Sequence, residues 1–539
     1  MRYELTNIVT GYKSQLIFLN YSCIGVILKI LLRISIIYFF NLSFAFSKID
    51  LDQKLNQQWI NYKNAQNELL FNIENNLQNK TQNLISRNTW EDIIRLNSEY
   101  QITSEDVLLL KNRQKIKIRQ AKINSQLRSK IDFDILRKIE FSEQDLHKIK
   151  TFCEKIPKGG MLHVHPFGTF NRDTINQLLE SQNPVLSIRS ILKDIENANG
   201  NATIFPYEQE GLLSLVDGLN YLQYSKENQK YFQQFLFLPF GKQPFSRFNS
   251  VFYFLGTAVH TWVDYEKALF DFSRRAFKQG VIYVEFTSGF SNELASIIEK
   301  IQREVGLIIR VNYSFDRTQT PEDLFEQAKK ILEMPRNKYL VGIDFLDNEE
   351  ENPAFEKGQL LYGAFLKAKI SKTSDLHLTM HAGELGDIRN PRDAIILGSE
   401  RLGHGVNLME DAIALEYASQ NKIPVEINLV SNLRLTKINN LKEHPFLNYL
   451  RLGLPVSLST DDEGIFDTDI KNECVMVIKE TDISYDEFKQ MSYNSIEYSF
   501  ATESDKKLLL TILNQRFIDF EKSIQFSNQF NLINYKLKF

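Results

Sequence analysis

Short apolar runs alternate with amphipathic segments along the later two thirds of the chain. Eight runs rich in branched and aromatic residues begin at positions 161, 281, 307, 339, 376, 401, 424 and 455. Most are separated by stretches in which apolar residues recur at helical spacing. This alternation predicts a parallel sheet, and eight strands predict a closed (β/α)8 TIM barrel of the α/β class. The interval 170–280 exceeds one crossover, so we expect extra helices over the barrel mouth.

The residues before the barrel follow a different pattern. From 48 to about 150 the chain is rich in Asn, Gln, Lys and Leu, and apolar residues recur at spacings of three and four, which predicts amphipathic helices. We expect residues 48–156 to form a helical extension that either caps the barrel or joins two copies in a homodimer. A basic run at 111–122 is typical of a solvated helix face. The barrel domain would then occupy 157–539.

Residues 1–47 resemble a targeting segment. Lys29 and Arg33 precede an apolar run at 34–46 that ends among small residues. The run is short for a bilayer span but suits the core of a secretory signal peptide. We therefore expect export to the periplasm or the cell exterior. The alternative is a single membrane anchor formed by residues 24–46.

Charge and cysteine content narrow the classes of partner and site. The chain has 64 basic and 67 acidic residues, a net charge of −3, which gives no global field for binding nucleic acid. The three cysteines, Cys23, Cys153 and Cys474, have no CxxC spacing, so a metal would sit on histidines and carboxylates. Cys153 and Cys474 could form a disulfide in an oxidising compartment, although two buried thiols are favoured.

Four of the eight histidines lie at the ends of predicted strands. His163 and His165 are two residues apart on the first strand, so both side chains point to one face, as two ligands of a single metal ion would. His381 and His404 end later strands. Strand ends converge on one mouth of a parallel barrel, which would bring the four together. The alternative for the first pair is ordinary core or surface histidines.

Acidic residues complete the candidate site. Asp461 and Asp462 follow the eighth strand, and because neighbouring carboxylates repel each other, a cation is expected beside them. The alternative is that they cap a helix. Three histidines and an aspartate suit Zn²⁺ best, while Fe, Co or Mn could use the same ligands. Glu384 would then carry protons, with His404 and Asp462 orienting hydroxide or substrate, which predicts metal-assisted attack of water on an electrophilic carbon.

Five ordered motifs resemble the adenosine deaminase family: PKGGMLHVH, MHAGE, RLGHG, PVEINLVSN and HPFLNYLRLGLPVSLSTDD. The resemblance runs from about Pro157 to about residue 515, and the extension looks more like the secreted, growth-factor-type members. It implies one Zn²⁺ per chain, bound by His163, His165, His381 and Asp461.

The resemblance also implies catalytic roles. Glu384 would protonate purine N1 as water attacks C6, His404 would orient or deprotonate that water, and Asp462 would contact N7. The implied reaction converts adenosine or 2′-deoxyadenosine to inosine or 2′-deoxyinosine plus ammonia.

Two positions depart from the family pattern. Phe167 follows the HxH pair where the family usually carries a carboxylate that holds the ribose 5′-hydroxyl. Asp347 aligns with a glycine whose backbone serves purine N3 in the compact enzymes. Both are candidate substrate contacts. The alternatives are therefore a deaminase of a 5′- or N6-modified adenine nucleoside, or an extracellular nucleoside- or receptor-binding protein with secondary catalysis.

Overall fold

The computed structural model describes residues 50–72, 84–95, 102–138, 143–335, 337–370 and 372–526. The predicted signal peptide or anchor in residues 1–47 lies outside these ranges. Within them, no helix has the length and apolar character needed to cross a membrane.

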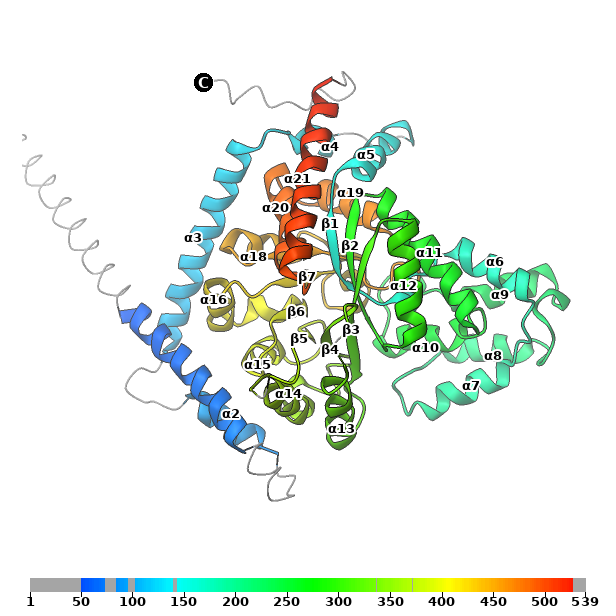
Figure 1. The fold of residues 1–539 in the computed structure, drawn as a ribbon, viewed down its shortest axis with the longest axis horizontal. Coiled ribbons are helices and arrows are strands. Elements are labelled where there is room, and N and C mark those ends of the chain that lie inside the picture. Colours follow the sequence, from blue (N-terminus) through cyan, green and yellow to red (C-terminus); the bar gives the residue numbers. More distant parts are fainter. Residues whose placement is uncertain are drawn as a thin grey trace, which may run out of the picture.

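Eight parallel strands occupy the centre of the molecule (Figure 1). In chain order they are β1 (Gly159–Val164), β2 (Val281–Ser288), β3 (Ile308–Asp316), β4 (Leu340–Leu346), β5 (His377–Ala382), β6 (Arg401–His404), β7 (Val425–Ile427) and β8 (Val456–Leu458). Each pairs with the next in sequence, and a parallel bridge between Val164 and Asp461 joins the last strand region to the first. The predicted (β/α)8 barrel is confirmed.

Helices in the crossovers surround these strands. They are α12 (Asn292–Glu304), α13 (Pro321–Leu332), α14 (Ala354–Ile370), α15 (Asn390–Ile396), α16 (Ala412–Gln420), α17 (Leu429–Leu435) and α18 (Phe446–Leu452), followed by α19 (Ile470–Glu480), α20 (Tyr485–Glu497) and α21 (Glu503–Phe526). Local signals set their starts. At α13, for example, the Thr320 side chain accepts a hydrogen bond from the Asp323 backbone N–H, and Pro321 occupies the first helical position.

The long interval between β1 and β2 holds the expected extra helices. They are α6 (Arg172–Gln182), α7 (Ile188–Asn197), α8 (Pro206–Ser214), α9 (Lys226–Gln233), α10 (Phe245–Leu255) and α11 (Trp262–Lys278), with short 3-10 turns at η2 (Pro166–Thr169), η3 (Tyr221–Gln223) and η4 (Gln234–Leu236). Figure 1 shows α6 to α9 grouped to one side of the barrel. Helix α10 and the segment that follows α7 are the parts of this insertion that line the cavity described below.

The N-terminal extension is helical, and its helices before residue 129 lie on the side of the barrel opposite α6 to α9 (Figure 1). It comprises a helix over residues 50–72, then α2 (Arg87–Arg95), α3 (Ser104–Arg128), α4 (Phe133–Arg137) and α5 (Glu143–Lys155). Helix α3 packs on α16, α18 and α20. Part of the basic run docks this helix, because Arg113 pairs with Asp52 and Glu416, and Lys117 also pairs with Glu416.

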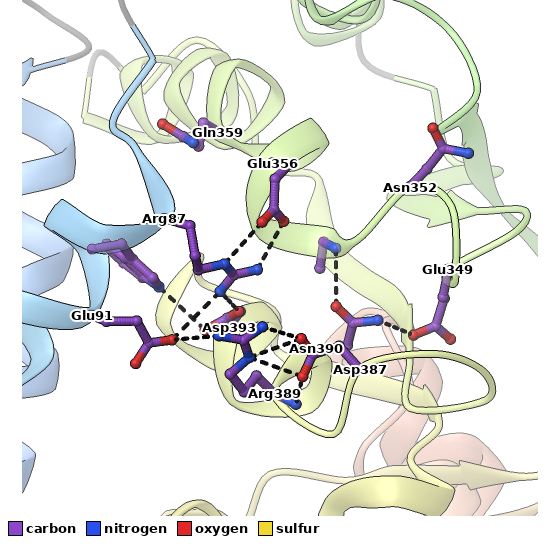
Figure 2. Close-up of polar contacts among 12 residues, drawn as sticks. Arg87, Glu91, Glu349, Asn352, Glu356, Gln359, Asp387, Arg389, Asn390 and Asp393 are labelled. Atoms are coloured by element: carbon purple, nitrogen blue, oxygen red, sulfur yellow. Dashed lines mark hydrogen bonds and ion pairs between the residues drawn. The ribbon is translucent and has the colours of Figure 1, made fainter.

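A cluster of ion pairs fastens α2 to α14 and α15 (Figure 2). The Arg87 guanidinium donates twice to Glu356, at 2.8 Å each, and also contacts the fully buried Asp393. The Trp90 indole N–H donates to Asp393 at 3.2 Å. On α15, Arg392 pairs with Glu91 at 2.6 Å. We call these residues the α2 clamp.

Cys153 on α5 and Cys474 on α19 are buried free thiols, as the sequence favours. They are also neighbours, with their sulfur atoms 2.6 Å apart.

Candidate active site

The four predicted metal ligands converge at the carboxyl ends of the barrel strands. His163 lies in β1, His165 directly follows it, His381 is in β5, and Asp461 follows β8. The Nε2 atoms of His165 and His381 are 3.3 Å apart. Asp461 Oδ1 lies 3.2 Å from His165 Nε2 and 3.7 Å from His163 Nε2. Ligand atoms of a tetrahedral zinc ion with bonds near 2.0–2.1 Å would be roughly 3.3 Å apart, so this spacing fits such an ion.

The hydrogen bonds behind the rings set the tautomers that a metal requires. His163 Nδ1 faces a Glu426 carboxylate oxygen at 2.9 Å, and His381 Nδ1 faces Asp344 at 3.1 Å. A carboxylate only accepts, so each Nδ1 carries the proton and each Nε2 turns its lone pair toward the centre. His163 Nε2 is buried without a hydrogen-bond partner among the described residues. The donor set therefore fits a divalent cation.

Further side chains hold the carboxylates that orient the histidine rings. Arg401 donates to Glu426 at 2.6 Å and to Glu285 at 2.5 Å in the barrel interior. Asp344 also accepts from the Thr287 hydroxyl at 2.8 Å. Each ring-orienting acid is thus itself held, so the ligands have few alternative orientations.

Glu384 follows β5 in a tight turn. Gly383 has φ +91°, and a side chain there would collide with Pro391. Glu349 accepts the backbone N–H groups of Gly383 and Glu384 at 2.8 and 3.0 Å, which fixes the turn. Burial and the nearby charges of Asp461, Glu349 and Asp462 raise the pKa of Glu384 well above its ordinary value. A carboxyl group that keeps its proton near neutrality is suited to donate it.

The Asp461 and Asp462 pair lies where the chain turns after β8. Asp461 has φ +58°, unusual for a residue other than glycine. Burial and the Asp461 charge raise the pKa of Asp462 well above normal. A side chain at Gly168 would meet Asp462 Oδ1 at 1.7 Å, so only glycine fits above this carboxyl group. Neither aspartate caps α19, whose N-cap is Asp469.

His404 ends β6 and is buried beside the cluster. Its Nε2 lies 3.7 Å from Glu384 Oε2 and 4.0 Å from Asp461 Oδ2. Burial, followed by the neighbouring His163, lowers its pKa well below the ordinary value, so the ring is neutral at physiological pH. Its other nitrogen faces Asn432 at 2.9 Å.

A cavity of about 410 Å³ opens onto this cluster. His165, His381, Glu384, His404, Asp461 and Asp462 line its inner end. Aromatic residues of α10 form one wall, and polar residues together with three apolar ones line the remainder: Phe245, Phe248, Phe252 and Tyr253, then Asn201, Asn249, Asp316, Thr318 and Asp347, then Ala198, Ala202 and Leu346. The volume is in the range of pockets that hold small organic ligands.

The two candidate substrate contacts fall in different places. Asp347 lines the cavity, at φ +87°. Phe167 is not brought to that cavity. It packs against Phe170 and Tyr265 and lines a neighbouring hollow of about 640 Å³. The side chain turns away because η2 begins immediately after His165.

Sequence reasoning missed the α10 wall and the Asn432 contact to His404. The aromatic density of residues 245–254 was a usable signal for the wall, but it did not indicate which side faces the cavity. Asn432 lies in the motif that follows β7, yet only the packing of α17 against β6 reveals its partner.

A closed parallel barrel with a histidine and carboxylate cluster at its carboxyl end defines the class of metal-dependent barrel hydrolases. The family model for adenosine deaminase matches residues 232–515. The chain therefore belongs to the adenosine deaminase family of hydrolytic aminohydrolases.

Individual relatives support this family assignment at moderate sequence identity. The chain is 27% identical to the adenosine deaminase of Enterococcus faecalis over 283 residues, which is 50% of this chain and 81% of that protein. It is 32% identical to the Clostridium botulinum adenosine deaminase over 180 residues, which is 33% of this chain and only about half, 51%, of that protein.

Two solved structures share the fold. An adenine deaminase from Arthrobacter aurescens matches with a TM-score of 0.51 and 22% identity, over 67% of this chain and 99% of its own. An amidohydrolase from Burkholderia ambifaria with bound Zn matches with a TM-score of 0.52 and 17% identity, over 72% of this chain and 97% of its own.

Proposed function

We propose that this chain hydrolyses the 6-amino group of adenosine or 2′-deoxyadenosine, with one Zn²⁺ per chain, giving the 6-oxo nucleoside and ammonia. The observation that carries the proposal is that Nε2 of His163, Nε2 of His165, Nε2 of His381 and a carboxylate oxygen of Asp461 converge at the inner end of one cavity, beside Glu384, whose pKa is raised. The zinc-bearing relative in Burkholderia ambifaria supports the choice of metal.

The residues divide the work by position. His163, His165, His381 and Asp461 would hold the ion, which supplies hydroxide at neutral pH by lowering the pKa of water toward about 7. Glu384 would give its proton to purine N1, which makes C6 more electrophilic. Asp462, whose pKa is raised by burial and by the Asp461 charge, would donate to N7. His404 faces the space shared by Glu384 and Asp461, where the attacking oxygen would lie.

The cavity favours a neutral nucleoside over a nucleotide. The aromatic wall of α10 suits the purine faces. Asp316 and Asp347 line the same cavity, and burial followed by repulsion from Asp316 raises the pKa of Asp347. Both carboxyl groups can hydrogen-bond ribose hydroxyls, and neither would attract a phosphate.

A 5′- or N6-modified adenine nucleoside is the second candidate substrate. It is favoured by Phe167, which replaces a ribose-binding carboxylate and lines the neighbouring hollow instead of the cavity. A binding protein with secondary catalysis is less well supported, because a binder has no need for Glu384, His404 and Asp462 together.

The test is formation of the 6-oxo nucleoside by the zinc-loaded protein, starting at Lys48, from adenosine, 2′-deoxyadenosine, a 5′-deoxy-5′-thio analogue and an N6-methyl analogue, with release of ammonia from the first three and of methylamine from the last. Fast release from adenosine supports the main proposal. Turnover of a modified analogue alone would transfer the proposal to that substrate, and no turnover of any of them would reject deamination in favour of binding.

A homodimer through the N-terminal helices is a further proposal. Leu108, Ile116, Ile123 and Leu127 on α3 are about half exposed or more. At 100° per residue they fall within an arc of roughly 100°, opposite the buried Asp106, Leu110 and Gln114. A mass measurement by light scattering of wild type and of an Ile116→Glu, Leu127→Glu variant tests it, and a wild-type monomer would reject it.

Export to the periplasm or the cell exterior also stays a prediction.

A further inference from the structure

The buried residues behind His404 determine which of its two ring nitrogens carries the proton. Its Nδ1 lies 2.9 Å from Asn432 Nδ2, on α17, and 3.5 Å from Asn428 Nδ2, the N-cap of the same helix. All three side chains are buried, at 1% exposure or less. Bulk water therefore does not compete for these contacts, and each donor and acceptor must be matched within the protein.

The orientation of the Asn432 amide follows from its other neighbour. Asn432 Oδ1 lies 3.0 Å from Nε2 of the buried His444. His444 Nδ1 in turn accepts the backbone N–H of Phe446 at 3.3 Å. Phe446 is the first residue of α18, so its N–H has no acceptor within that helix.

A backbone N–H can only donate, and this fact fixes the direction of each hydrogen bond that links Phe446 to His404. His444 Nδ1 must offer its lone pair to Phe446. Burial lowers the pKa of His444 to about 3, so the ring is neutral and carries its one proton on Nε2. Asn432 must then present its oxygen to His444 and its NH₂ group to His404. A flipped Asn432 amide would set two donors against each other at His444.

We propose that the chain Phe446, His444, Asn432, His404 fixes His404 as a hydrogen-bond donor, through Nε2–H, to the attacking oxygen. This inference rests on the proposed deaminase function. With its Nδ1 lone pair occupied and its proton on Nε2, the neutral ring orients hydroxide and does not deprotonate water. Asn432 and His444 are positioning residues that act through His404.

These hydrogen-bond directions predict the effect of a side chain at position 432 that accepts from His404 instead of donating to it. Asn432→Asp is nearly isosteric, but its carboxylate only accepts, so it would draw the His404 proton to Nδ1. Fixing the wrong histidine tautomer in a serine protease triad lowers kcat by about 10⁴. We expect Asn432→Asp to lower kcat at least about 10²-fold, with KM changed less than about threefold and zinc content unchanged. His444→Gln keeps an N–H donor for Asn432 and should retain kcat within about tenfold of wild type.

The deciding experiment records ring ¹⁵N shifts of the zinc-loaded full chain labelled at histidine, with His404 assigned by the signal missing from His404→Asn. An unprotonated Nδ1 and protonated Nε2 in wild type, moving to a protonated Nδ1 in Asn432→Asp, supports the proposal. A protonated Nδ1 in wild type overturns it, even if the variants fail to fold.

Kinetics provide the second arm. An Asn432→Asp enzyme with wild-type kcat would also overturn the proposal. A wild-type protein that releases no ammonia from any nucleoside would reject the proposed function, whereas the ring shifts report the tautomer without turnover. The two failures are therefore distinguishable.

Discussion

Two buried clusters of charge in this molecule have opposite character. In the α2 clamp every charge faces an opposite one: Arg87 faces Glu356 and Asp393 (Figure 2), and Arg392 faces Glu91. At the barrel mouth, Glu384, Asp461 and Asp462 crowd together beside four imidazoles, and no Arg or Lys among the described residues lines this end of the cavity. There the pKa values of Glu384 and Asp462 are raised, by burial first and by their neighbours second.

The difference distinguishes charges that hold helices in place from charges that bind a ligand or take part in a reaction. Paired charges satisfy one another and hold two elements in place, which is what α2 needs to dock. Buried titratable groups with strongly perturbed pKa values, gathered in one cavity, are typical of sites where a ligand or a reaction uses them. Two buried atoms of the second cluster, His163 Nε2 and Asp462 Oδ1, have no hydrogen-bond partner in the described part of the chain. The residues of the α2 clamp have no such atom among those described.

The largest effect is expected from Glu384→Gln, because it removes the proton donor and leaves the metal ligands intact. We expect kcat to fall about 10³-fold or more, with metal content unchanged and the free energy of unfolding unchanged or raised. Ammonia release, metal analysis and denaturant unfolding measure the three quantities. The exposed Glu350→Gln is the matched control. Near-wild-type turnover in Glu384→Gln would remove this residue from the mechanism.

Metal removal tests the same cluster as a binding site. Chelation should abolish turnover and lower the melting temperature, since free zinc at about 100 times its Kd would stabilise the fold by about 2.7 kcal/mol. Asp461→Ala should bind little zinc and show no such stabilisation. Full activity in protein verified to be metal-free would contradict this expectation.

The α2 clamp should respond in the opposite way. Arg87→Ala leaves the buried Asp393 with Arg392 and Trp90 only, so we expect the free energy of unfolding to fall by about 1–3 kcal/mol. Turnover below the melting temperature should stay within about twofold. The exposed Arg95→Ala at the end of α2 should do neither. A large loss of kcat in Arg87→Ala would show that the clamp reaches the site.

A buried acid away from both clusters makes the stability depend on pH. Burial raises the pKa of Glu473 to about 8, from 4.5 for an ordinary glutamate. The folded chain thus keeps a proton that the unfolded chain releases, so the contribution to stability is full below pH 4.5 and is lost as pH rises to about 8. Relative to wild type, Glu473→Gln should gain stability across that window. The exposed Glu480→Gln should run parallel to wild type. Parallel curves for Glu473→Gln would contradict the raised pKa.

The sequence by itself determined the barrel and the residues gathered at its mouth. Eight apolar runs predicted the eight strands, and their ends predicted the convergence of His163, His165, His381 and His404, because strand periodicity and parallel topology are local or repeating properties. Asp461 and Asp462 follow the last strand, so the same rule placed them.

Only the tertiary structure decided which side chains stand behind these residues. Glu426 and Asp344 orient rings carried by other strands, Asn432 on α17 contacts His404, and His444, just before α18, contacts Asn432. Phe167 sits beside a predicted ligand in sequence but turns into a neighbouring hollow, while α10, far along the chain, supplies the cavity wall. These contacts depend on packing between segments distant in sequence, and no local pattern of hydrophobicity or spacing carries that information.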